Sequence, residues 1–429
     1  MTYPISVRAI AEFAHEGGDL LLDFAAAERM REGMEGHITL QRALDASWRA
    51  EMPLARAVTI ARVTLRIQGR ADAVRLGAIP AVEEIKTTGR DPARIREDEY
   101  PVHWAQAQIY AAILCRREGA PAAEVALVYY NLSGTKVRFT RSYPASELER
   151  LFFEYAEKYA NWLAALEVWR GTFQPSVMQL PFPFDTYRDG QRQMAANAYI
   201  AVRDRKRVMI EAPTGIGKTA AALYGALKAS GEGRVSAIFY LTARTTGRRA
   251  AETAVDLMRE KGLCARTVTI TAKEKACIPG DLDCFHCPYA QGYFDRHRQA
   301  LMKALSMQKL DEHAIRALAE EYMLCPFELS LGLAETADVI ICDYNYAFDP
   351  RVRLSRFFAR KNSCALLVDE AHNLPERAQD MLSAQLSGRE IARLRRDVGA
   401  SDPLYPALTK AARAFKAGED EEPEARTLP

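Results

Sequence analysis

The stretch "RVMIEAPTGIGKTAAALYGAL", residues 207–227, decides the fold class. A short apolar run, Val208 to Ile210, predicts a β-strand, and the Ala- and Leu-rich stretch after Thr219 has the spacing of a helix. Glycines between the two allow backbone N–H groups to close around phosphates. The pattern A-x-x-x-x-G-K-T, which begins at Ala212, therefore predicts a phosphate-binding loop in an α/β domain with a parallel sheet.

Four residues of this loop predict how it would hold ATP. Gly215 and Gly217 would form the cradle for the phosphates. Lys218 would reach the β- and γ-phosphates, and the hydroxyl of Thr219 would ligate Mg²⁺. The expected ligands of this site are therefore ATP and Mg²⁺.

A second stretch, "CALLVDEAHNLPERA", supports the nucleotide site. The apolar run 365–368 predicts a buried strand that ends in Asp369 and Glu370. A carboxylate at the end of a parallel strand can hold the Mg²⁺ of a nucleotide, and its neighbour can polarise the attacking water. A lone Asp-Glu pair is usually a solvated strand end, but downstream of a phosphate loop it predicts a nucleoside triphosphatase.

The composition bounds the class of protein. A length of 429 residues allows two or three domains, and 48% hydrophobic with 27% charged residues is ordinary for a globular chain. The net charge of +2 gives no global basic field, so a DNA-binding surface would have to be local. The sequence shows no signal peptide and no apolar run of about 20 residues. We expect a cytoplasmic monomer without a membrane partner, with reduced thiols.

Half of the eight cysteines have a spacing that suggests metal ligands. Cys277, Cys284, Cys287 and Cys325 form the pattern C-x6-C-x2-C-x37-C. Four thiolates can hold Zn²⁺ or a 4Fe-4S cluster, and spacing alone does not separate the two. A zinc ribbon usually shows two close C-x2-C pairs, whereas this pattern has one, which favours the cluster.

The first 180 residues show a different pattern of predicted helices and strands. Helical patterns up to about Trp48 precede two predicted strands, a helix and a hairpin with Ser133-Gly134 at its turn. A long aromatic-rich helix and a Pro-containing linker follow. The ranges are 62–76 and 79–88 for the strands, 103–117 for the helix, 124–143 for the hairpin, 151–170 for the long helix and 171–184 for the linker.

Three polar residues on these strands predict a second metal site. Asp72 lies on the first strand, and Glu84 and Lys86 lie two apart on the second, hence on one face. Two carboxylates beside a lysine can hold Mg²⁺ or Mn²⁺ and activate water, which is the minimum for phosphodiester hydrolysis. Taken alone, Glu-x-Lys on a strand is more often a surface ion pair.

Several motifs resemble those of superfamily-two helicases. Asp369-Glu370-Ala371-His372 resembles motif II, "FPFDTYRDGQRQM" (182–194) resembles the adenine-reading Q motif, and "FYLTARTTGRRAA" (239–251) resembles motif Ia. The resemblance implies a DNA helicase that binds ATP. It implies nucleotide contacts by Gln191, Asp369 and His372, Glu370 as the base, and a DNA phosphate contact by Arg244.

The cysteine-containing stretch narrows the resemblance to the XPD/DinG family of iron–sulfur helicases. That family carries three close cysteines after motif Ia and a later C-P-[FY]-E, and "ETADVIICDYNYAFDP" (335–350) is similar to its segment before motif II. The resemblance implies that the four cysteines hold a 4Fe-4S cluster, against which single-stranded or forked DNA is guided in the 5′ to 3′ direction. It also implies DNA contacts by Tyr344 and Asn345.

The N-terminal part resembles the RecB-like branch of the PD-(D/E)xK nucleases. In that branch a helical Q-x-x-x-Y follows the strands, matched here by Gln106 and Tyr110, and an upstream histidine, matched by His37, joins the metal. The usual Pro-Asp is Ala71-Asp72 here. The resemblance implies a restriction-endonuclease-like fold that cuts DNA with Mg²⁺ or Mn²⁺ held by His37, Asp72 and Glu84. The alternative is an inactive fold that only binds DNA.

These patterns predict four regions. The ranges are 1–175 for the nuclease-like domain, 181–275 with 338–382 for the first motor domain, 276–337 for the cluster domain, and 383–429 for the start of an arch insertion with an acidic tail. We expect no second motor domain in this stretch, and hence a fragment or truncated copy that binds nucleotide with little turnover. Two rival functions stay open: an ATP-gated nuclease without unwinding, and a DNA-binding module with a nucleotide switch.

Overall fold

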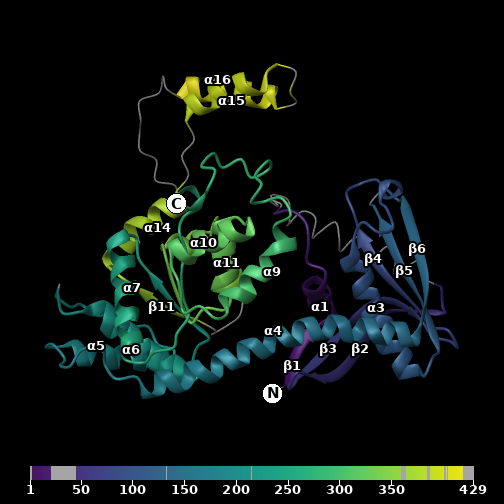
Figure 1. Cartoon of the computed structure of the whole chain (residues 1–429). Helices are drawn as coiled ribbons and strands as arrows, with labels where there is room; N and C mark the ends of the chain where they lie inside the picture. Colours follow the sequence, from purple (N-terminus) through teal and green to yellow (C-terminus); the bar gives the residue numbers. More distant parts are fainter. Residues whose placement is uncertain are drawn as a thin grey trace. The chain divides into compact units, whose positions relative to one another are not determined.

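The structure is a computed structural model in which the chain divides into two units. The first unit comprises residues 1–343 and 356–369, and the second comprises 344–355 and 370–429. Both β-sheets belong to the first unit (Figure 1). The structure describes residues 2–20, 45–131, 133–213, 215–358, 364–383, 387–400, 402 and 404–418.

A six-stranded mixed sheet forms the N-terminal part. Its order is β1-β3-β4-β5-β6, with β2 paired to the other edge of β3. Helices α1, α3 and α4 pack their apolar side chains against it. The bounds are β1 (Thr2–Ser6), α1 (Val7–Ala14), β2 (Trp48–Ile60), β3 (Val63–Arg75), β4 (Ala81–Thr87), α3 (Pro101–Glu118), β5 (Ala122–Tyr130), β6 (Lys136–Pro144) and α4 (Ala145–Gln179).

Most of the predicted elements of this part are confirmed. Strands β3 and β4 carry Asp72 and Glu84, helix α3 follows them, and β5 and β6 form the hairpin. Gly134 supplies the positive φ (92°) that its turn requires. Strands β1 and β2 were not predicted. In β2, the arginines and Pro53 obscure the alternation of apolar and polar residues that is expected of a strand.

A five-stranded sheet, parallel throughout, forms the second part of the first unit. Its order is β11-β7-β10-β8-β9, and α6 and α7 bury apolar side chains against it. This arrangement confirms the predicted α/β class. The bounds are α6 (Lys218–Gly231), β7 (Ala237–Leu241), α7 (Thr245–Glu260), β8 (Thr267–Thr269), β9 (Lys309–Leu310), β10 (Val339–Cys342) and β11 (Cys364–Val368).

The strand predicted at Val208–Ile210 is wrong. Residues 206–213 form no helix or strand, and the side chains of Val208 and Met209 are 48% and 93% exposed. A strand needs a neighbour that accepts its hydrogen bonds. Among the described strands, β11 pairs with β7 alone, so its outer edge is open, yet residues 206–213 form no ladder with it.

Helix α4 joins the two parts of the first unit. Its 35 residues, about 52 Å long, contain the predicted helix, but the linker predicted from residue 171 is wrong as far as Gln179. The helix continues through Pro175 although proline removes a backbone donor. The reason is that Phe173 and Val177 on either side of the proline are buried in the core of the parallel sheet.

A buried polar joint fixes α4 beside the parallel sheet. Trp169 Nε1 donates to Asp338 Oδ2 at 2.9 Å, and the guanidinium of Arg266 lies 4.2 Å from the centre of the Trp169 ring. Arg266 is fully buried, and its backbone N–H also donates to Asp338 Oδ2, at 2.7 Å. Burial raises the pKa of Asp338 to about 6, although the backbone N–H of Arg266 acts to lower it.

The remaining helices are short. None of the helices in the described ranges is long and apolar enough to cross a membrane. In the first unit they are α5 (Gln191–Arg203), α8 (Lys273–Ala276), α9 (Tyr293–Ala304), α10 (Glu312–Tyr322) and α11 (Pro326–Ala334). α13 (Ser355–Phe358) begins in the second unit and ends in the first, and α12 (Asn345–Phe348), α14 (Leu374–Leu382), α15 (Gly388–Val398) and α16 (Tyr405–Gly418) belong to the second.

Candidate functional site

The loop before α6 has the backbone of a phosphate cradle. Gly215 and Gly217 have φ angles of 83° and 82°, which glycine adopts at little steric cost, and Gly217 is the N-cap of α6. The helix N-terminus is therefore directed at the loop, where its N–H groups favour an anion. Lys218 Nζ donates to Ala212 O at 3.2 Å, and Thr219 Oγ1 lies 3.1 Å from Tyr240 Oη on β7.

Gln191 lies against this loop in a way that fits a nucleotide. Its side chain is 1% exposed, and Oε1 accepts from the backbone N–H of Arg188 at 3.0 Å. Nε2 is buried and has no hydrogen-bond partner among the described residues. A Cβ placed on Gly217 would lie 2.5 Å from Nε2. A buried amide donor beside a glycine cradle is what an adenine-reading residue requires, so the residues fit ATP.

Asp369 lies at the carboxyl edge of the parallel sheet. Its backbone N–H donates to Leu241 O at 2.9 Å, which places it beside the end of β7. A Cβ on Gly247 would collide with Thr242 Oγ1 and lie 3.0 Å from Asp369 Oδ2. Glycine at the start of α7 therefore leaves room for a carboxylate where Mg²⁺–nucleotide ligands are expected.

The second unit holds four further predicted residues. Glu370 has a left-handed backbone (φ 48°), and its Oε2 lies 3.4 Å from His372 Nδ1. Tyr344 is fully buried and its hydroxyl donates to Glu370 O at 3.3 Å. Asn345 Oδ1 accepts from Arg377 at 3.3 Å. Tyr344 therefore supports the backbone at Glu370, and the DNA contacts of Tyr344 and Asn345 stay predictions.

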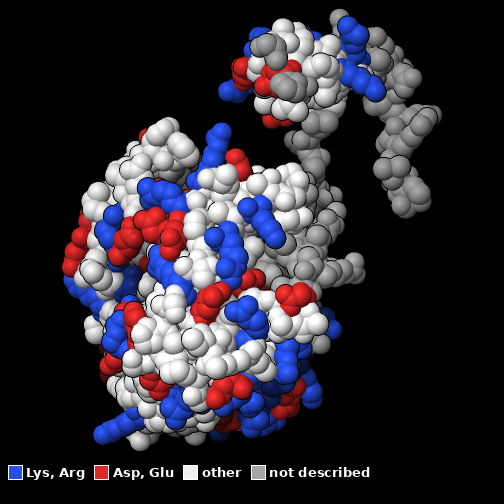
Figure 2. Space-filling view, turned by 90° about the vertical axis from the view of Figure 1, so that its right-hand side faces the viewer, with Lys and Arg blue, Asp and Glu red and all other residues white. Residues whose placement is uncertain are grey.

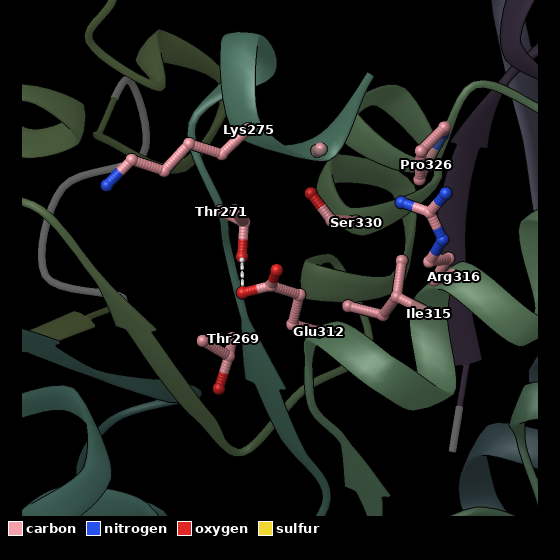
Figure 3. A pocket seen from close by; sticks show the side chains of 9 residues that line it. Thr269, Thr271, Lys275, Glu312, Ile315, Arg316, Pro326 and Ser330 are labelled. Atoms are coloured by element: carbon pink, nitrogen blue, oxygen red, sulfur yellow. Dashed lines mark hydrogen bonds between the residues drawn. The ribbon is translucent and has the colours of Figure 1, made fainter. Parts of the chain in front are cut away.

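The motif Ia-like segment separates into an exposed and a paired arginine. Arg244, the N-cap of α7, is exposed. Arg248 instead donates to Thr271 Oγ1 at 3.2 Å and lies 3.7 Å from a carboxylate oxygen of Glu312. Thr271 and Glu312, joined by a hydrogen bond, line a small cavity beyond β8 together with Lys275 and others (Figure 3). Arg248 thus anchors α7 to α10.

The predicted carboxylate site is brought together where β3 and β4 diverge. Paired residues cover only 73–75 of β3 and 81–83 of β4, after which Asp72 Oδ2 accepts from the backbone N–H of Ile85 at 2.7 Å. Lys86 Nζ donates to Glu84 Oε1 at 2.7 Å and to Gln106 Oε1 at 3.3 Å. Asp72, Glu84, Lys86 and Gln106 therefore converge from three elements, while metal binding and phosphodiester hydrolysis at this place stay predictions.

Burial controls the protonation of this site. Burial raises the pKa of Asp72 to about 6, while the Ile85 N–H and the Lys86 ammonium act to lower it, and Glu84 hydrogen-bonds to its carboxyl group. Burial and the charges of Glu84 and Asp72 also raise the pKa of Tyr110. The hydroxyl of Tyr110 fills the place that a Cβ on Gly69 would take. His37, the predicted fourth member, lies outside the described residues.

Sequence reasoning missed Glu51, which lies opposite Asp72. In the β2–β3 ladder, Ala50 pairs with Ala73 and Met52 pairs with Ala71, so Glu51 stands opposite Asp72 with no extra residue in either strand, and its backbone has a φ of 50°. Its charge is one of the effects that raise the pKa of Asp72 and Tyr110, after burial. No sequence signal marks this position, because a left-handed backbone is usually signalled by glycine and residue 51 is a glutamate.

The four predicted cysteine ligands are all partly exposed. Lys273 hydrogen-bonds to Cys284 and lies near Cys325; although burial lowers the pKa of Lys273, these thiols and Glu328 raise it overall. Cys277 Sγ accepts from the backbone N–H of Gly280 at 3.4 Å. Within the described ranges, however, no three His, Cys, Asp or Glu side chains form a group that could hold a metal ion. The cluster therefore stays a prediction.

Comparisons with known proteins bear on the class. Residues 248–391 match the family model described as DEAD_2. The chain is 26% identical over 280 residues to a regulator of telomere elongation helicase 1 homolog from Caenorhabditis briggsae, which covers 54% of this chain and 27% of that protein. The chain thus spans about a quarter of the length of this curated relative. Over these parts the chain is therefore similar to DEAD_2 proteins and to a helicase.

Two solved structures are similar over part of the chain. An XPD helicase is 19% identical with a TM-score of 0.40, covering 55% of this chain and 41% of that chain. An alkaline exonuclease, LHK-Exo from Laribacter hongkongensis, is 14% identical with a TM-score of 0.24, covering 38% of this chain and 90% of that chain. TM-scores this low carry no argument of their own.

Proposed function

We propose that this chain supplies the ATP-binding part of an XPD-like DNA helicase that works 5′ to 3′, combined with a metal-dependent PD-(D/E)xK nuclease domain. The observation that carries the helicase part is the buried Gln191 Nε2 beside the Gly217 cradle. Lys218, Thr219 and Asp369 would hold ATP and Mg²⁺. Bound ATP supplies the free energy of phosphoanhydride hydrolysis, and Glu370 would polarise the attacking water.

ATP affinity tests the nucleotide site. Lys218→Ala should weaken ATP and GTP alike by roughly tenfold or more, since a charge-assisted hydrogen bond contributes about 1.5–3 kcal/mol. Gln191→Ala should weaken ATP and remove the preference for ATP over GTP. Lys136→Ala, on β6 of the other sheet, is the control and should change neither affinity. Unchanged ATP affinity in both Lys218→Ala and Gln191→Ala would refute the proposal that ATP binds in this pocket.

Unwinding tests the motor. Forked and 5′-tailed duplexes should be unwound by a form of the protein that includes the rest of a motor, and Lys218→Ala should abolish this. A preference for 3′-tailed duplexes would refute the direction. ATP-dependent cleavage with no strand displacement would favour the rival function, an ATP-gated nuclease.

The nuclease part rests on the convergence of Asp72, Glu84 and Lys86 on adjacent strands. Asp72 and Glu84 would hold Mg²⁺ or Mn²⁺, and Lys86 would orient the attacking water. Glu84→Gln should lower DNA cleavage by at least about a hundredfold. Glu83→Gln is the matched control, because Glu83 accepts from Arg138 instead of Lys86. DNA that stays intact with either metal would leave only the inactive DNA-binding fold.

The cysteine-rich segment completes the proposal. We propose that Cys277, Cys284, Cys287 and Cys325 hold a 4Fe-4S cluster, for which the spacing and the proximity of Lys273 to Cys284 and Cys325 are the support. Anaerobically purified protein should be brown and contain about four irons per chain. Colourless protein that contains one zinc per chain would show that the four cysteines form a zinc site instead of holding the cluster.

A further inference from the structure

We propose that Nε2 of His103 donates a hydrogen bond to a phosphate of the DNA strand that is cleaved at the Asp72–Glu84 site. This inference rests on the proposed nuclease function, to which it adds a contact with the substrate. His103 lies in the first turn of α3, three residues before Gln106, whose Oε1 accepts from Lys86 Nζ at 3.3 Å. Residues three apart are neighbours on the surface of a helix, so His103 lies on the side of α3 that faces the site.

The sheet places the hydrogen-bond partner of His103 beside Lys86. Tyr129 on β5 pairs with Lys86 on β4, and paired residues lie on the same face of a sheet. Helix α3 packs against both of these strands. The Tyr129 hydroxyl lies 2.8 Å from His103 Nδ1. His103 and Lys86 are therefore neighbours at the proposed nuclease site.

Neighbouring aromatic rings hold the imidazole of His103 in one orientation. The centres of the Tyr100 and Tyr129 rings lie 5.1 Å and 5.7 Å from the centre of the imidazole. Tyr129 is buried and packs edge-on against Phe139, and the Tyr100 hydroxyl accepts from Arg90 at 3.0 Å. A side chain that is already fixed by its neighbours loses little conformational freedom when it binds a ligand.

The imidazole of His103 is neutral and carries its proton on Nε2. Burial, the charge of Lys86 and that of Arg8 lower the pKa of His103 to about 3, so one ring nitrogen donates and the other accepts. Burial also raises the pKa of Tyr129, whose hydroxyl therefore keeps its proton. Because a phenol is more acidic than the N–H of a neutral imidazole, the Tyr129 hydroxyl donates to Nδ1. This hydrogen bond fixes the tautomer with the proton on Nε2.

Nε2 of His103 is open to a ligand. Within the described ranges it has no hydrogen-bond partner, and protein atoms do not enclose it. Asp72, Glu84 and Gln106 are buried, whereas Lys86 and His103 are partly exposed and so lie on the solvent side of the site. The oxygens of a DNA phosphate are acceptors, so an N–H donor at this place matches them.

Surface charge alone gives this protein little attraction for DNA. On the face shown in Figure 2, Lys and Arg are interspersed with Asp and Glu, as a net charge of +2 leads one to expect. Phosphates must therefore be held by local donors. Lys86 already donates to Glu84 and Gln106, whereas the Nε2 donor of His103 is not used by the described residues of the site.

Two substitutions of His103 in the full chain test the donor. The amide nitrogen of glutamine reaches the place of Nε2, whereas asparagine reaches only the place of Nδ1. His103→Gln should therefore keep most of the cleavage activity, and His103→Asn should lower kcat/KM for single-stranded DNA by about tenfold or more. His313→Ala, exposed on α10, is the control and should change nothing. Equal losses in His103→Gln and His103→Asn, or a loss in neither, would contradict the contact.

Binding of single-stranded DNA in EDTA, where no cleavage occurs, supplies the second readout. A single methylphosphonate, in which a methyl group replaces one phosphate oxygen, should weaken binding to the wild type at one position and should not weaken binding to His103→Asn there. Equal effects on both proteins at every position would overturn the assignment. Because the donor is neutral, His103→Asn should keep the slope of log affinity against log salt. A slope reduced by about 0.7 would indicate a cationic contact and contradict the proposal.

The two proposals fail separately. A wild-type chain that cleaves no DNA but shows the position-specific methylphosphonate effect would refute the nuclease and keep His103 as a DNA contact. Cleavage with the same kcat/KM in the wild type and in His103→Asn would refute the contact alone. If His103→Asn instead raised the Mg²⁺ concentration needed for half-maximal cleavage and kept its DNA affinity, His103 would be a metal ligand, and the phosphate contact would be wrong.

Discussion

Gly217 and Gly215 share a left-handed backbone, but only Gly217 faces a neighbouring side chain. A Cβ on Gly217 would lie 2.5 Å from Gln191 Nε2, whereas one on Gly215 would meet nothing within 4 Å among the described atoms. Alanine at either position costs about 1–2 kcal/mol for its conformation. Gly217→Ala should cost about 1–3 kcal/mol more, because Gln191 is buried and must move.

Thermal unfolding of the nucleotide-free protein measures this difference. Gly217→Ala should lower Tm more than Gly215→Ala does. The double variant Gly217→Ala/Gln191→Ala should have a higher Tm than Gly217→Ala alone. Adding Gln191→Ala to Gly215→Ala should not raise the Tm. Equal Tm values for the two alanine variants would mean that Gln191 does not lie against the loop.

At the scale of residues, what could be predicted depended on how far apart the partners lie in sequence. The glycines with Lys218 and the pair Glu84 and Lys86 act through local spacing, which a sequence displays directly. Glu51 comes opposite Asp72 through the pairing of β2 with β3, at a left-handed backbone position with no marker in the sequence. The partner of Arg248, Glu312, lies on a helix that follows much later in the chain.

Helix α4 shows what tertiary packing adds at the scale of elements. Propensity predicts an end near Gly171 because Pro175 follows, yet the helix continues to Gln179. The buried Phe173 and Val177 outweigh the lost backbone hydrogen bond. The opposite holds for Val208–Ile210, whose apolar pattern predicts a strand that has no partner in the described sheet.

The joint between α4 and the parallel sheet should weaken as pH rises from about 4 to about 6. Burial raises the pKa of Asp338 from 3.8 to about 6, so the folded state keeps its proton in a range where the unfolded state has lost it. Stability therefore falls as pH rises through this window, by about 3 kcal/mol at most, and is constant above it.

Asp338→Asn isolates this effect, because asparagine keeps an oxygen that can accept from Trp169 Nε1. The free energy of unfolding of the wild type minus that of the variant should fall between pH 4 and pH 6 in urea titrations. A pH-independent difference in stability between the variant and the wild type does not affect this result. A difference that rises or stays flat across the window would show that Asp338 is ionised in the folded protein.

At the scale of the whole molecule, a segment near the N-terminus joins parts that are far apart in sequence. The backbone N–H of Leu20 donates to Ala290 O at 2.9 Å, and that of Phe294 donates to Gly18 O at 3.0 Å. Glu16 accepts from Arg298, whose guanidinium lies 3.4 Å from the centre of the Phe13 ring. Contacts between residues so far apart in the sequence cannot be predicted from a local pattern. These contacts connect the N-terminal part to α9.

Breaking the Glu16–Arg298 pair should therefore loosen both elements at once. Both side chains are only about a third exposed, so removing one partner with Arg298→Gln should lower the opening free energy by about 1 kcal/mol, more than for an exposed pair. Hydrogen exchange should become faster in α9 and in α1 together. Arg316→Gln, which breaks the exposed Arg316–Glu320 pair within α10, is the control and should affect neither. Faster exchange in α9 alone would mean that the segment does not couple the two parts.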